Sequence, residues 1–118
     1  MAPNVAPPDR RRHMRVQIGV QIEIRPEGTS VPMRLETSDL SLGGCYIEMA
    51  LTLDVGTRVD IVLWVEQQKL TTRGVVVTRH PQFGNGIVFA GMCLESKRQL
   101  HTFLDSHQNT NRAGTPLV

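Results

Sequence analysis

The feature that most constrains the fold is an alternation of apolar and polar residues. Apolar side chains occupy every second position from Val16 to Ile24, and polar or small residues fill the positions between them. Successive side chains of a strand point to opposite faces, so this pattern predicts a strand with one buried face. Residues 25–29 are expected to form a turn. Further strands are expected at 33–36, 45–49, 59–66, 69–79 and 86–89.

One helix is expected, near the C-terminus. Ser96 and Gln99 have the spacing of a capping box, and Leu100, Phe103 and Leu104 follow at helical spacing. Strands joined by turns, without helices between them, favour an antiparallel sheet or small barrel. The sequence therefore predicts an all-β fold with one C-terminal helix, placed as a lid on an open end of the barrel.

The chain of 118 residues is long enough for one domain. We expect a flexible proline-containing leader at 1–9, the folded domain at 10–107 and a disordered tail at 108–118. No apolar run approaches the ~20 residues that span a bilayer, and no signal-peptide pattern opens the chain, so a cytoplasmic protein without membrane contact is expected. Cys45 and Cys93 form no metal or disulfide pattern, and we interpret both as small core residues.

The positive charge is concentrated before the first expected strand. The formal net charge is +2, and four arginines, at 10, 11, 12 and 15, lie within six residues. Arg11 and Arg15 are four residues apart, and each guanidinium matches a phosphate or a guanine edge with two parallel hydrogen bonds. Two such groups could clamp a nucleotide. Taken alone, the same run is also compatible with a solvated charge cluster.

A second candidate motif is Asp-Leu-Ser-Leu-Gly-Gly at 39–44. An ionised Asp39 accepts two parallel hydrogen bonds, which suits the N1–H and N2–H₂ donors of guanine, and Ser41 adds a hydroxyl. Gly43 and Gly44 permit positive φ and leave no Cβ in the way of a ligand. The alternative is a tight turn in which Asp39 and Ser41 bond only their own backbone.

Together the two motifs resemble the signature of the PilZ domain, a bacterial receptor module for cyclic di-GMP. The signature is RxxxR before the first strand, here Arg11 with Arg15, followed by DxSxxG, here Asp39, Ser41 and Gly44. The resemblance implies a six-stranded β-barrel with a C-terminal helix. It also implies a ligand held between the N-terminal arm and the barrel surface.

Further site residues follow from the same resemblance. In this family an arginine directly before the first motif arginine, here Arg10, tends to accompany an intercalated ligand dimer, whose four phosphate charges the four arginines would balance. Arg12, Gly43 and Tyr46 are secondary candidates, and Glu48 lies beside them in the pattern. The late strand Gly86-Ile-Val-Phe89 is a weaker family feature.

The expected function is that of a non-enzymatic cyclic di-GMP receptor that signals to a downstream effector protein, and a homodimer is left open. No cofactor and no metal site is expected, because the four histidines are scattered. The alternatives are a small-barrel nucleic-acid binder and a ligand-free adaptor. The first is disfavoured because aromatic residues make up only 4% of the chain. The second is disfavoured because an adaptor has no need of either motif.

Overall fold

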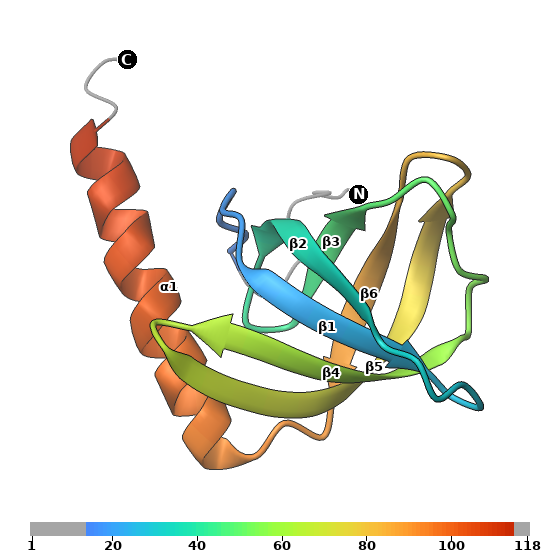
Figure 1. Ribbon diagram of the computed structural model, residues 1–118. Helices are drawn as coiled ribbons and strands as arrows, with labels where there is room; N and C mark the ends of the chain where they lie inside the picture. Colours follow the sequence, from blue (N-terminus) through green and yellow to red (C-terminus); the bar gives the residue numbers. More distant parts are fainter. Residues whose placement is uncertain (1–13, 115–118) are drawn as a thin grey trace, which may run out of the picture.

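The computed structural model describes the backbone of residues 14–114 and the side chains of residues 14–107. Six antiparallel strands form a closed barrel in the order β1-β2-β3-β6-β5-β4, and one helix lies across an end of it (Figure 1). This confirms the predicted fold class. The elements are β1 (Gln21–Pro26), β2 (Met33–Leu40), β3 (Gly44–Glu48), β4 (Arg58–Val65), β5 (Gln68–His80), β6 (Gly84–Ala90) and α1 (Leu94–Gly114).

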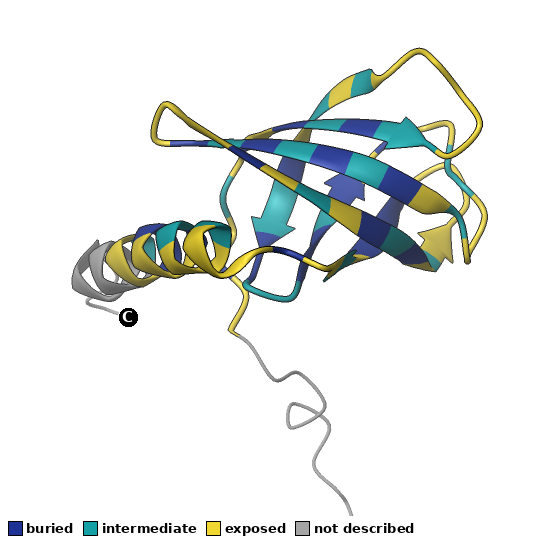
Figure 2. Ribbon diagram, turned by 90° about the horizontal axis from the view of Figure 1, so that it is seen from below, coloured by how far each residue is buried: buried dark blue, intermediate teal, exposed yellow. Residues whose placement is uncertain are grey.

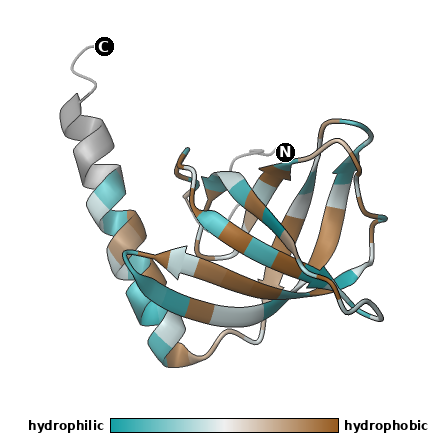
Figure 3. Cartoon of the chain, in the orientation of Figure 1, coloured by the Kyte–Doolittle hydropathy of each residue, from teal (hydrophilic) through white to brown (hydrophobic). Residues whose placement is uncertain are grey.

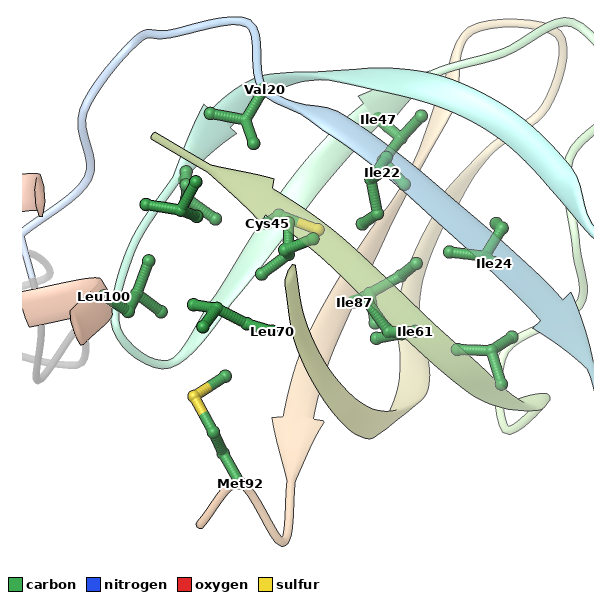
Figure 4. Packing of buried hydrophobic residues seen from close by; sticks show 14 of the residues in the cluster. Val20, Ile22, Ile24, Cys45, Ile47, Ile61, Leu70, Ile87, Met92 and Leu100 are labelled. Carbon is green, nitrogen blue, oxygen red and sulfur yellow. The ribbon is translucent and has the colours of Figure 1, made fainter. Parts of the chain in front are cut away.

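The alternation of the sequence becomes the inside and outside of the barrel. Buried and exposed positions alternate along the strands (Figure 2), and so do hydrophobic and hydrophilic ones (Figure 3). In β4, four inward side chains are at most 2% exposed and interleave with more exposed ones. The interior is a single apolar cluster of branched aliphatic side chains around Cys45 (Figure 4). These inward residues include Ile22, Ile24, Ile47, Ile61, Leu63, Leu70, Val76 and Ile87.

The first strand is shorter than predicted. Val16 and Val20 are buried as the alternation requires, but Val16 makes only an isolated bridge, and β1 begins at Gln21. The ladder is interrupted by the hydroxyl of Thr37, which accepts from the backbone N–H of Val20 (3.0 Å) and donates to the carbonyl of Ile18 (2.8 Å). A side chain thus replaces part of the backbone pairing. The predicted turn at 25–29 also starts later, because β1 stays paired with β4 as far as Pro26.

The helix starts before the predicted cap. α1 begins at Leu94, and the residue before it is Cys93, whose Sγ accepts the backbone N–H of Ser96 at 3.5 Å. Ser96 therefore occupies the first turn and does not cap it, and Gln99 instead donates to Glu95 at 3.3 Å. The capping-box prediction was wrong because the thiol satisfies the amide that a serine or aspartate cap usually satisfies.

The apolar stripe of α1 closes one end of the barrel core, as expected. Leu100, Phe103 and Leu104 are at most 7% exposed and belong to the same cluster as the inward strand residues. Figure 4 shows Leu100 facing the barrel interior near Leu70. The predicted tail at 108–118 overlaps the last turns of α1, which ends at Gly114. The predicted leader at 1–9 lies outside the described residues. The predicted domain boundaries therefore stay a prediction.

Among the residues described, no helix is long and apolar enough to cross a membrane, and no three His, Cys, Asp or Glu side chains gather as metal ligands would.

Candidate functional site

The two motifs meet through one ion pair. The Arg15 guanidinium Nη1 lies 2.6 Å from the Asp39 carboxylate Oδ1, although 24 residues separate them in the sequence. The Arg15 and Asp39 side chains are 31% and 27% exposed, so the pair is reachable from solvent. Such a charge-assisted contact orients both groups before any ligand arrives.

Backbone pairing holds Arg15 in this place. Its neighbour Val16 makes two hydrogen bonds with Leu40, from Val16 N–H to the Leu40 carbonyl (2.8 Å) and from Leu40 N–H to the Val16 carbonyl (2.9 Å). Val16 and Leu40 are also both buried in the core. Arg15 and Asp39 each adjoin a residue of this bridge in the sequence. The isolated Val16–Leu40 bridge therefore aligns the two motifs.

Ser41 and the glycines form the turn between β2 and β3. The Ser41 hydroxyl accepts the backbone N–H groups of Gly43 and Gly44, both at 3.1 Å, and the side chain is only 4% exposed. The Ser41 backbone N–H also donates to the Gly44 carbonyl at 2.8 Å. Ser41 therefore shapes the turn, as the alternative interpretation held for this residue, whereas Asp39 bonds the Arg15 side chain and not its own backbone.

Gly44 has a structural role in strand packing, in addition to the role predicted for it at the ligand. Within residues 14–114, the glycines with positive φ are Gly28, Gly56 and Gly91, so the motif glycines do not use that freedom. A Cβ on Gly44 would instead lie 2.1 Å from the backbone carbonyl oxygen of Ile87 in β6. The absence of a side chain allows β3 and β6 to approach each other.

Tyr46 lies beside Asp39 on the outer face of the barrel. The two residues are partners in the β2–β3 register, and their neighbours Leu40 and Cys45 form the inward pair. The Tyr46 hydroxyl is 2.8 Å from Nδ1 of His80. Its ring leans over Gly84, where an added Cβ would come within 2.7 Å of Cε1. This position suits a residue that borders a bound ligand.

His80 is a residue that sequence reasoning missed. It is far from both motifs in the sequence, and no spacing links it to Tyr46. The contact arises because β3, β6 and β5 are adjacent in the barrel, a register that a single sequence does not show.

A shallow hollow of about 510 Å³ starts one residue away from Asp39. It runs between the segment that precedes β1 and the outer faces of β2 and β3, and Glu36 and Glu48 contribute carboxylates to its wall. Carboxylates accept base N–H groups and repel phosphates, so this hollow suits a base better than a phosphodiester. Its other lining residues are Gln17, Ile18, Gly19, Thr37 and Ser38.

The remaining predicted site residues, Arg10, Arg11 and Arg12, lie outside the described residues. The structure brings together Arg15, Asp39, Ser41, Gly43, Gly44 and Tyr46.

The sequence profile of the PilZ domain family matches residues 9–106, which is most of the chain. The chain belongs to the PilZ domain family. The match covers every residue of the two motifs, including the arginines that precede the described part of the chain. No curated protein matches the chain.

Solved structures show the same PilZ fold. The PilZ domain of YcgR from Escherichia coli, solved with c-di-GMP, is 19% identical and superposes with a TM-score of 0.71, covering 92% of this chain and 99% of that one. The Bacillus subtilis inhibitor of motility MotI/DgrA is 17% identical with a TM-score of 0.74, covering 86% of this chain and 53% of that one. A longer YcgR chain, in complex with c-di-GMP, is 21% identical with a TM-score of 0.73, covering 89% and 49%. The chain thus spans about half the length of MotI and of the longer YcgR.

The two cysteines of this PilZ domain have opposite environments. Cys45 is completely buried on β3, where it is the register partner of Leu40. Burial raises the pKa of its thiol to about 12, with the Asp39 charge adding to the effect. Cys93 was expected in the core but is exposed, because it precedes the first turn of α1. Hydrogen bonding to Ser96 lowers the pKa of the Cys93 thiol.

We expect thiol-specific reagents to separate the two cysteines. The thiolate is the reacting form, so Cys93 should react with Ellman's reagent below the pH at which an unfolded cysteine reacts, and its rate should level off at a lower pH. Cys45 should react only after unfolding. Counting reacted thiols with and without denaturant between pH 6 and 10 checks this. Rapid modification of two thiols in the native protein would contradict the burial of Cys45.

Proposed function

We propose that this PilZ domain is a non-enzymatic receptor for cyclic di-GMP, acting in the cytoplasm of a bacterium. The observation that carries the proposal is the Arg15–Asp39 pair, because it joins the RxxxR and DxSxxG motifs at one exposed place on the barrel. Family membership and the c-di-GMP complexes of YcgR support the ligand.

The chemistry of the site suits a guanine dinucleotide. Arg15 gives Nη1 to Asp39, and its guanidinium has further N–H groups for a phosphate or for the O6/N7 edge of guanine. Asp39 gives one carboxylate oxygen to Arg15 and can accept a base N–H with the other. We further propose that Arg10, Arg11 and Arg12 close over the ligand and that Tyr46 borders it.

Binding in this arrangement changes the surface that a partner can read. We propose that ligand binding orders the arginine segment against the barrel. Ligand concentration is thereby converted into a new surface. The output is then carried by a downstream effector protein or by another copy of the chain.

Calorimetric titration with cyclic di-GMP tests the receptor function, with GMP and cyclic di-AMP as controls. Saturable binding of cyclic di-GMP alone is the expected result. Two ligands per protomer are expected if Arg10 supports an intercalated dimer, and one ligand would refute the dimer while leaving the receptor intact. Absence of binding at micromolar concentrations would refute the receptor itself.

We expect Asp39→Ala and Arg15→Ala each to weaken cyclic di-GMP binding by about tenfold or more. Each change removes a charge-assisted hydrogen bond, typically ~1.5–3 kcal/mol, together with the pre-alignment of its partner. Arg34→Ala is the matched control, because Arg34 is an exposed arginine on β2 that pairs with Glu23. Equal affinities for all three variants and the wild type would exclude Arg15 and Asp39 from the site.

A further inference from the structure

A row of alternating charges crosses three adjacent strands away from the candidate site. In the strand register, Asp60 of β4 pairs with Arg25 of β1 on one side and with Arg73 of β5 on the other. The Asp60 carboxylate contacts both arginines, through Oδ2 to Arg25 Nη2 and through Oδ1 to Arg73 Nε at 3.8 Å. One carboxylate is therefore shared by two guanidinium groups, and positive charge is left in excess.

A third arginine adds to this excess. Arg58 is two residues before Asp60 on β4, so its side chain leaves the same face of the strand. Arg58 is exposed, and within residues 14–107 its guanidinium makes no hydrogen bond or ion pair. The three arginines and Asp60 line a hollow of about 430 Å³, whose lining also includes Val75 and Ala90.

The surface beside the arginines is apolar. Val75 and Ala90 alternate with inward residues on β5 and β6, and Val88, the register partner of Val75, is 45% exposed. We call Arg58, Arg73, Val75, Val88 and Ala90 the Arg–Val face. It combines two guanidinium groups with a small aliphatic surface, which is the composition of a protein contact more than of a solvated barrel wall.

The arginines of this face lie on the far side of the barrel from the motifs. In the closed order β1-β2-β3-β6-β5-β4, β5 is opposite β2 and β4 is opposite β3 (Figure 1). Asp39 is on β2, and the motif turn joins β2 to β3. The Arg–Val face approaches the motifs only at its edge on β6, where Val88 is the register partner of Gly44. A ligand at the motifs therefore leaves Arg58 and Arg73 accessible.

We propose that the Arg–Val face docks an acidic segment of a partner protein. A carboxylate of the partner binds between Arg58 and Arg73, whose forked donors match it, and an adjacent aliphatic side chain packs on Val75 and Val88. The hollow is lined by three arginines and by two carboxylates, those of Asp60 and Glu27, so a net charge of about +1 remains. That excess suits one partner carboxylate better than the successive phosphates of a nucleic acid. The proposal does not depend on cyclic di-GMP binding.

The test uses the full chain and a capped peptide of sequence Glu-Leu-Glu-Leu-Glu, titrated while backbone amide chemical shifts are recorded. Saturable shifts are expected at the Arg–Val face and not at Asp39. Arg58→Glu should weaken peptide binding by about tenfold or more, because it replaces an attractive charge with a repulsive one. Arg34→Glu makes the same charge change on β2 and should leave the affinity within about twofold.

A second variant separates docking from general charge effects. Asp60→Asn removes the carboxylate that occupies Arg25 and Arg73, so the peptide should bind more tightly than to the wild type. The Gln-Leu-Gln-Leu-Gln peptide should not bind. The proposal would be overturned if the glutamate peptide caused no saturable shifts, if Arg34→Glu weakened its binding as much as Arg58→Glu, or if the glutamine peptide bound equally well. It would also be overturned if a single-stranded oligonucleotide displaced the bound glutamate peptide more strongly than free glutamate peptide does. A separate titration with cyclic di-GMP reports on the receptor function independently.

Discussion

Replacing the motif glycine Gly44 with alanine should destabilise the fold itself. The added Cβ would be placed 2.1 Å from the Ile87 carbonyl oxygen, and the obstacle is backbone, which cannot move aside as a flexible side chain does. The pairing of β3 with β6 would have to open, at a cost of ~3 kcal/mol or more. For a domain of this size, that corresponds to a fall of about 12 °C or more in the melting temperature.

Thermal unfolding followed by circular dichroism measures this effect. Gly86→Ala is a graded control, because its Cβ would meet the Thr78 side chain at 3.1 Å and not backbone. It should therefore cost less than Gly44→Ala. A Gly44→Ala variant that melts at the wild-type temperature would show that Gly44 serves the ligand and not the barrel. Because the fold itself is affected, loss of ligand binding in this variant would not identify Gly44 as a contact residue.

Removing the buried side-chain amide of Asn85 should also lower the stability of the fold substantially. Asn85 is fully buried on β6, and its amide makes three hydrogen bonds to backbone, accepting from Leu53 N–H (2.7 Å) and donating to the carbonyls of Leu53 (2.9 Å) and Thr78 (3.2 Å). It thereby fastens the loop between β3 and β4 to the barrel. Asn85→Ala leaves these groups without partners, at ~1–3 kcal/mol for each one that stays buried.

Denaturant unfolding of Asn85→Ala and hydrogen exchange at the Leu53 amide measure the two consequences, lower stability and a loosened loop. Arg79→Ala is the matched control, because Arg79 holds the same loop from outside through Thr52 (2.9 Å) and Asp54 (3.0 Å). An exposed contact of this kind contributes ~1 kcal/mol or less. If Arg79→Ala costs as much as Asn85→Ala, the buried amide is not the main fastening.

Most of the fold was predictable because a strand pattern needs only local information. The alternation in 59–66 places the inward residues of β4 correctly, since the side-chain period of a strand is independent of its neighbours. What the pattern missed depends on contacts across strands. The end of the ladder before Gln21 is set by the hydroxyl of Thr37, and the burial of Asn85 is set by a loop 32 residues away.

The site was predictable in part for the same reason. The motif spacing identified Arg15 and Asp39, and the structure places them in contact. The roles of Ser41 and Gly44 were less accessible, because a hydroxyl used inside a turn and a glycine used for strand packing look identical in sequence to ligand contacts. His80 was missed because its partner Tyr46 is two strands away.

The closure of the barrel has a consequence for synthesis on the ribosome. β1 pairs with β4 through register partners such as Ile22 and Leu63. During synthesis, more than half of the domain must therefore leave the ribosome before β1 can pair with β4. Until then the nascent chain carries an uncovered hydrogen-bonding edge, the kind of surface that invites pairing with other chains. When this protein is overproduced, we therefore expect aggregates to form from nascent chains with an unpaired β1 edge, and not from the folded barrel.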